Sequence, residues 1–294
     1  MTGTGFPTMA GGYFFGTVLL TGIPVGALGL RIVHALTGGA WGEEIGGRLR
    51  AASRALPLAA LLWVPVFFML GRIYLWASPG AVPMTSAKAL YMSPAFFVAR
   101  TLFYFAVWIG SSWWLDRRND AHRLVGLLAV AYVLFGSFAA IDWVMSLEPR
   151  WQSTIFGLLY VIGEVLLGYA VLIAVHGWSR RRTALSAEER RRFIDLGNIL
   201  LTLVMLWAYL VLSQFLIIWM ANKPDEISWY LAGTRGRWSA LPVVLGVGHF
   251  LLPFLLLLRR EWKANPLILA GIASWIILMR VVDVGWMVFP GLVR

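Results

Sequence analysis

The sequence contains no cysteine and only four histidines in 294 residues. Without cysteine the chain cannot form a disulfide, a thiolate zinc site, an iron–sulfur cluster of the usual kind or a covalently attached haem c. A haem b would need two histidines at one depth, and His34 with His176 is the only pair that could qualify. We therefore expect no metal and no cofactor held by this chain, so that any redox centre belongs to a partner protein.

Charged residues are also scarce, at 13% of the chain against 60% hydrophobic residues, and the mean hydropathy is +0.75. Such a composition cannot cover a water-soluble surface of ordinary size, and it indicates a polytopic membrane protein. The net charge of +11 does not point to nucleic acid, because the Lys and Arg residues lie in short loops between apolar runs. We expect lipid and protein partners, and no nucleic acid.

Long apolar runs predict an all-α fold with about eight transmembrane helices. Glycines at 16, 22, 26 and 29 mark the first run as a surface for close helix packing. Between the first two runs, apolar residues recur at helical spacing beside charged ones over 37–54, which predicts a short interfacial helix. The predicted spans are approximately 13–34, 56–76, 94–115, 124–145, 152–176, 193–221, 239–258 and 266–290.

Fifteen of the 25 Lys and Arg residues fall in alternate loops, which should therefore be cytoplasmic. Both termini then face outward, which in a bacterium means the periplasmic side of the inner membrane. The segment Ala140–Met145 near the end of the fourth span resembles Val282–Met287 near the end of the eighth. This short repeat predicts two four-helix bundles, residues 1–149 and 150–294, related as a parallel pseudo-repeat.

Several ionisable residues lie within or next to the apolar runs. A charge at the bilayer centre costs about 2.5–3.5 kcal/mol on insertion scales, so these groups should pair with one another inside the bundle. Arg280 and Asp283 are three residues apart on one helix and can pair directly. One interpretation is a set of structural salt bridges, and for His249 a hydrogen bond to a carbonyl near Pro253. The other is a proton path, whose candidates are Arg72, Arg100, Asp142, Glu164, His249, Arg280 and Asp283.

Several stretches from about Arg100 onward are distinctive: Asp142–Gly157, Trp207–Tyr209, Ser213–Phe215, Ile218–Glu226, Trp229–Leu231, Gly248–Phe250 with Pro253 and Phe254, and Arg280–Asp283. They resemble a known family, the NrfD/polysulphide-reductase membrane anchors. Within it, the resemblance is to the second quinol-oxidoreductase-type membrane subunit of bacterial alternative complex III. The resemblance implies that Glu148, in the first of these stretches, is a further candidate for the proton path.

The resemblance implies a subunit, without a redox centre of its own, of a respiratory complex that oxidises menaquinol or ubiquinol and passes electrons to a cytochrome c or an oxidase. Its implied partners are another NrfD-like membrane subunit, an iron–sulfur or molybdopterin-type protein and cytochromes c, which hold the iron–sulfur clusters and haem c. The family members that it most resembles have about ten spans, two more than this chain. No catalytic residue follows from the resemblance, and it assigns no quinone-binding residue.

Two other functions remain open on the sequence. A secondary transporter would place Glu164, His249, Arg100 and Arg280 along a substrate path between the two repeats. A central pair of broken spans, typical of such transporters, is not evident in the sequence. The chain could also be a purely structural membrane anchor of another NrfD-type redox complex.

Overall fold

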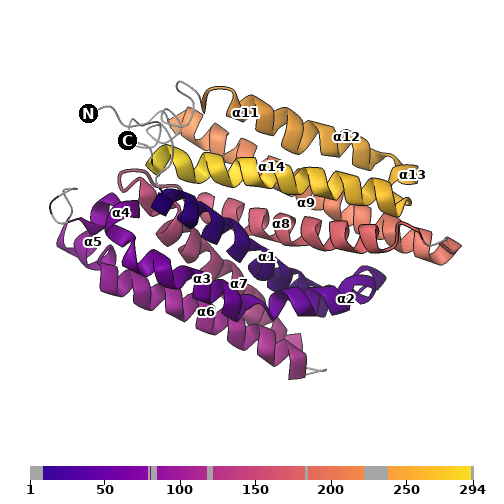
Figure 1. Cartoon of the computed structure of the whole chain (residues 1–294), viewed down its shortest axis with the longest axis horizontal. Helices are drawn as coiled ribbons and strands as arrows, with labels where there is room; N and C mark the ends of the chain where they lie inside the picture. The colour runs from indigo at the N-terminus through magenta and orange to yellow at the C-terminus, as the bar shows by residue number, and fades with distance from the viewer. Residues whose placement is uncertain are drawn as a thin grey trace.

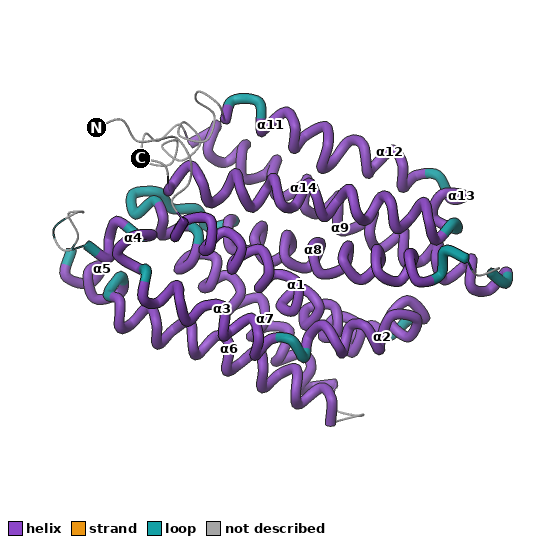
Figure 2. The backbone as a smooth tube through the Cα atoms, viewed as in Figure 1, coloured by secondary structure: helices purple, strands orange, loops and turns teal. Residues whose placement is uncertain are grey.

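The computed structural model describes residues 9–78, 80, 85–117, 122–182, 185–221 and 238–292, and these residues form helices with no strand among them (Figures 1 and 2). Among the described residues, eight helical segments are long and apolar enough to cross a membrane, so the protein is an all-α multi-pass membrane protein. The predicted loop between the sixth and seventh spans, 222–238, lies outside the described residues except for its last residue.

The elements before the centre of the chain are α1 (Met9–Thr37), α2 (Ala40–Ser53), α3 (Leu56–Phe68), α4 (Leu70–Ile73), η1 (Leu75–Ala77), α5 (Ser86–Tyr91), α6 (Pro94–Arg117), α7 (His122–Trp143) and η2 (Met145–Leu147). Those after it are α8 (Phe156–Ser179), α9 (Ala187–Ala221), α11 (Leu241–Val244), the π-helix η4 (Leu245–Leu251), α12 (Leu252–Leu258), α13 (Arg260–Lys263) and α14 (Pro266–Leu292).

Helix α8 lies at the centre of the molecule. It packs against α1, α7, α9 and α14, and 78% of its apolar stretch is buried within the protein, against 22% for the segment Leu241–Leu258 (Figure 1). Helix α1 contacts α3, α7 and α14 in addition to α8. A polar side chain on α8 is therefore shielded from lipid on most sides and must find its partners on neighbouring helices.

The predicted interfacial helix is present as α2. Ile45 and Leu49 are buried beneath it, and Glu43 on the same helix is exposed. Glu44 fixes α2 to the second half of the chain, because its carboxylate lies 3.2 Å from His176 Nε2 and accepts a 3.0 Å hydrogen bond from Arg192. The amphipathic pattern thus predicted both the helix and its buried face.

Two spans are less regular than expected. The second was predicted to continue to residue 76, but α3 ends at Phe68, and the chain is extended at Tyr74. The seventh span is irregular because the π-helix η4 lies within it, just before Pro253. Proline has no N–H to donate to the carbonyl of His249, four residues earlier, so a regular α-helical hydrogen bond is impossible at this point. The wider π turn places His249 where the helix is irregular.

Candidate functional site

Asp142 is held in a complete ion pair at the end of α7. Its carboxylate accepts hydrogen bonds from Arg100 Nε at 2.7 Å, from Arg100 Nη2 at 3.0 Å and from the Tyr104 hydroxyl at 2.7 Å. Arg100 also donates to the Tyr91 carbonyl at 2.8 Å, and its guanidinium lies 3.9 Å from the centre of the Tyr91 ring. Burial, with the Asp142 charge adding to it, raises the pKa of the Tyr91 phenol to about 12. In this cluster one cation, Arg100, thus balances one carboxylate, Asp142.

A second buried cluster surrounds Arg280 on α14. Arg280 Nη1 donates to Asp283, as the i, i+3 spacing predicted, and Nη2 lies 3.8 Å from Glu164 Oε1 on α8. All three side chains are essentially inaccessible to solvent. The distance of 3.8 Å is too long for a hydrogen bond, so charge attracts Arg280 and Glu164 without fixing their geometry. Arg280 therefore holds Asp283 tightly and Glu164 loosely.

Trp207 connects this cluster to His249. Its indole N–H donates to Asp283 at 3.1 Å, and its ring lies 4.0 Å from the imidazole of His249, measured between ring centres. His249 is fully buried, and neither of its ring nitrogens has a hydrogen-bond partner among the described residues. The expected hydrogen bond from His249 to a carbonyl is therefore not observed in this part of the chain.

Two glycines of α1 make room for Glu164. A Cβ atom at Gly22 would overlap the Glu164 carboxylate, and one at Gly26 would overlap the Glu164 backbone carbonyl. The approach is mutual, since a Cβ at Gly168 of α8 would lie 2.9 Å from the Ala27 nitrogen of α1. Gly16 has no neighbouring heavy atom within 4 Å of the equivalent position. Of the predicted contact glycines, Gly22 and Gly26 therefore bring α1 against the carboxylate-bearing turn of α8.

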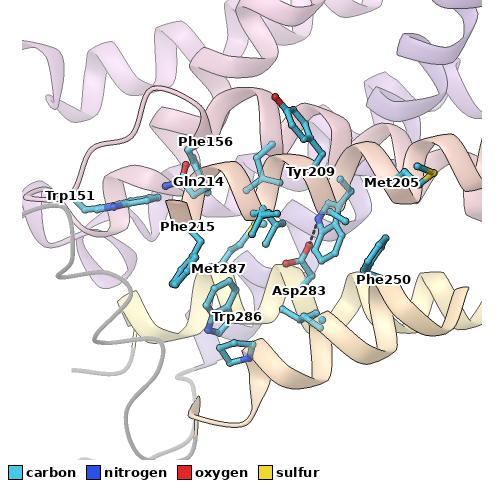
Figure 3. Close-up of a pocket in the computed structure, with 18 residues that line it drawn as sticks. Trp151, Phe156, Met205, Tyr209, Gln214, Phe215, Phe250, Asp283, Trp286 and Met287 are labelled. Atoms are coloured by element: carbon cyan, nitrogen blue, oxygen red, sulfur yellow. Dashed lines mark hydrogen bonds between the residues drawn. The ribbon is translucent and has the colours of Figure 1, made fainter. Parts of the chain in front are cut away.

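An apolar cavity of about 640 Å³ lies beside the Arg280 cluster, between α9, the α11–η4 segment and α14 (Figure 3). The Asp283 carboxylate lies in the middle of this view, among aromatic side chains that include Phe215, Phe250 and Trp286. Gln214 also lines the cavity. Its Oε1 accepts a 2.6 Å hydrogen bond from Ser153, and its buried Nε2 has no acceptor among the residues described. The described walls of the cavity therefore hold one carboxylate and one amide among mainly aromatic and aliphatic side chains.

The remaining candidates lie apart from this cluster. Arg72 is exposed on the short helix α4, where the interruption of the second span places it, and no ion pair to it is recorded among the described residues. Glu148 is half-buried just after η2. His34 approaches the Gly39 carbonyl at 3.1 Å, whereas His176 faces Glu44, so these two imidazoles have different partners.

Three residues of the two clusters and the cavity were missed by sequence reasoning. Tyr104, Trp207 and Gln214 each act through a contact with a distant part of the chain. Tyr104 and Gln214 are polar residues within apolar runs, a signal that could have identified them. Nothing in the local sequence distinguishes Trp207 from the other 15 tryptophans.

The fold and the two buried ionic clusters define a multi-pass α-helical membrane protein with ionisable groups in its interior. Within the described ranges, no group of three His, Cys, Asp or Glu side chains has the arrangement of a metal site. No model of a known protein family matches the chain, and no curated protein sequence matches it significantly.

Proposed function

We propose that the chain is an integral membrane subunit of a bacterial respiratory complex that oxidises quinol, and that its Arg280 cluster carries protons. The observation that carries this proposal is the charge composition of the two clusters. Asp142 has its own arginine, whereas Glu164 and Asp283 share Arg280, with no second cation within ion-pair distance among the described residues. The first cluster is neutral as it stands, and the second is neutral when it holds one proton.

That proton can reside on either of two carboxylates, Asp283 or Glu164. Asp283 lines the cavity, and Glu164 lies deeper, against α1. Because Arg280 is bonded to Asp283 but only 3.8 Å from Glu164, a small movement of the guanidinium can transfer its hydrogen bonds from one carboxylate to the other. The carboxylate that loses the arginine then becomes the one that holds the proton. Asp142 and Arg100 have no such freedom, and we assign them a structural role.

The cavity fits the head group of a quinol. A carboxylate that accepts and an amide that donates are the groups needed at the two ring oxygens, and the aromatic walls suit an isoprenoid tail. When bound and oxidised, the quinol would supply two protons and two electrons. Asp283 is positioned to receive a hydrogen bond from a ring hydroxyl, with Trp207 holding its carboxylate in place. The electrons must pass to a centre in a partner subunit, since the chain has no cysteine.

The helix contacts support the inferred pseudo-repeat. Helices α1, α3, α6 and α7 contact one another in a ring, and α8, α9, α12 and α14 form a second ring in the same order. Between the rings, α7 contacts α8 and α1 contacts α14. A two-fold rotation that places α1 on α8 and α7 on α14 would turn each of these contacts into the other. We infer two four-helix bundles related by an axis along the membrane normal, with both termini periplasmic in the bacterial inner membrane.

Purification from native membranes tests the assignment to a respiratory complex. We expect a tagged copy of the chain, expressed from its own locus and extracted in mild detergent, to co-purify with an iron–sulfur protein and a c-type cytochrome. The same preparation should contain bound menaquinone or ubiquinone. Recovery of the tagged chain from its native membranes without any partner protein would overturn the assignment, and would leave the transporter as the function to test. A complete complex without bound quinone would contradict only the proposal that the cavity binds quinol.

Replacement of Glu164 by glutamine tests the proton role. We expect Glu164→Gln to preserve assembly of the complex, because the amide has nearly the same shape, and to lower the number of protons released on the outer side of the membrane per electron transferred. Proton release is measured with a pH-sensitive dye in proteoliposomes supplied with quinol and an acceptor. The matched control is Glu43→Gln, which neutralises an exposed carboxylate on α2. Unchanged proton release and turnover in Glu164→Gln would exclude the Arg280 cluster as a proton carrier.

A further inference from the structure

A second cavity, of about 450 Å³, lies between the α2–α3 junction and the last turns of α6. Its polar wall contains Arg54 and Arg117, and its apolar wall contains Leu56, Pro57 and Ile109. Arg54 follows helix α2, and Arg117 ends the span α6, so we expect both to lie at the membrane surface. Ile109 lies about two turns deeper along α6. The cavity therefore changes from charged to apolar in the direction in which a lipid changes from head group to acyl chain.

The charge around this cavity is strongly positive. Asp116 is its one carboxylate among the described lining residues, and it is already paired with two arginines, Arg31 at 2.7 Å and Arg54 at 2.8 Å. Arg50 lies 3.7 Å from the same carboxylate. Three guanidinium groups thus lie within ion-pair distance of this one carboxylate, and Arg117 adds a fourth positive charge to the wall of the cavity. This excess of positive charge among the described residues favours binding of an anion.

The guanidinium groups are also available to a ligand. The side chain of Arg54 is 61% exposed, and its Nε is the atom bonded to Asp116, which leaves its two terminal nitrogens as donors. The Arg117 guanidinium lies 3.3 Å above the ring of Trp113, which orients it without using its hydrogen bonds. Behind the guanidinium groups of Arg54 and Arg117, Arg31 donates hydrogen bonds to Ser53 and Ser112, and these bonds make the base of the site rigid. This is a preformed anion site beside an apolar wall at the surface of the membrane.

We propose that this cavity binds the head group of an anionic phospholipid, with the phosphate between Arg54 and Arg117 and an acyl chain along Leu56, Pro57 and Ile109. Basic pockets between membrane helices recognise anionic head groups in this way. The phospholipid would hold the α2–α3 junction against the last turns of α6. Both the charge and the apolar wall are needed, so neither a neutral lipid nor a free phosphate satisfies the site.

Native mass spectrometry of the purified full chain tests this proposal. The detergent-solubilised protein is titrated separately with phosphatidylglycerol, phosphatidylcholine and inorganic phosphate. We expect retained phosphatidylglycerol at concentrations where the other two do not bind. Arg117→Gln, which breaks no ion pair among the described residues, should weaken retention about fivefold, and Arg54→Gln with Arg117→Gln about 25-fold. The matched control is Arg190→Gln with Arg191→Gln, which removes two exposed arginines from α9 at the same membrane face.

Three outcomes would overturn the proposal. Equal losses in the two double variants would show that surface charge alone attracts the lipid. Equal retention of phosphatidylcholine would show that only the apolar wall binds. Binding of inorganic phosphate as tight as that of the lipid would reduce the site to an anion site without an acyl chain. Because Arg117→Gln leaves the Asp116 ion pairs intact, its result stands even if the double variant fails to fold.

Discussion

Replacement of Arg280 by methionine is expected to destabilise the protein by about 3–5 kcal/mol, because it removes the one recorded cation of two buried carboxylates. Methionine fills a similar volume, so the loss of stability measures the missing positive charge rather than a new cavity. The free energy of unfolding is measured by denaturant titration of the purified chain in mild detergent micelles. Arg191→Met, at an exposed position on α9, is the control and should unfold with almost the same free energy as the wild type.

Neutralising the carboxylates should reverse this loss. In the triple variant Arg280→Met, Glu164→Gln and Asp283→Asn, no charge remains in the cluster, and a buried ionic group replaced as a whole can be nearly neutral for stability. We therefore expect the triple variant to regain most of the unfolding free energy and to lose proton release. If Arg280→Met by itself were as stable as the wild type, the two carboxylates would not depend on this arginine, and the charge argument for the proton role would fail.

Local sequence signals predicted the parts of the fold that depend on neighbouring residues. The interfacial helix α2 followed from its amphipathic pattern, and the pair Arg280–Asp283 followed from the spacing of one helical turn. The interruption after Phe68 was missed, although Pro65 lies one turn before it. As a consequence Arg72, expected inside the second span, lies on an exposed short helix.

The partner of each buried charge could not be predicted in the same way, because it depends on helix packing. Asp142 could have paired with Arg72, Arg100 or Arg280, and the structure pairs it with Arg100. Glu164 lies in the middle of the predicted fifth span, 152–176, but its position beside Arg280 depends on the rotation of α8 against α14. Depth follows from position in a span, whereas rotation follows from side-chain packing along the whole helix.

The packing of α1 on α8 gives the second large effect that we expect. Gly26→Ala places a Cβ on the backbone carbonyl of Glu164, where no side-chain rotation can relieve the overlap, so the two helices must separate. Overpacking of this kind costs about 1–3 kcal/mol. Gly16→Ala is the matched control, since it adds the same methyl group to the same helix with no heavy atom within 4 Å. Denaturant unfolding in detergent should separate the two variants clearly, and equal stability would contradict the close approach.

Gly22→Ala on the same helix separates the structural role of α1 from its effect on the proton. Its Cβ would meet the carboxylate of Glu164, the end of a flexible side chain, and the carboxylate can rotate away while the backbones stay in place. We therefore expect Gly22→Ala to be more stable than Gly26→Ala and yet to lower proton release, because Glu164 can no longer hold its position 3.8 Å from Arg280. Normal proton release in a stable Gly22→Ala protein would mean that the distance between Glu164 and Arg280 is not what moves the proton.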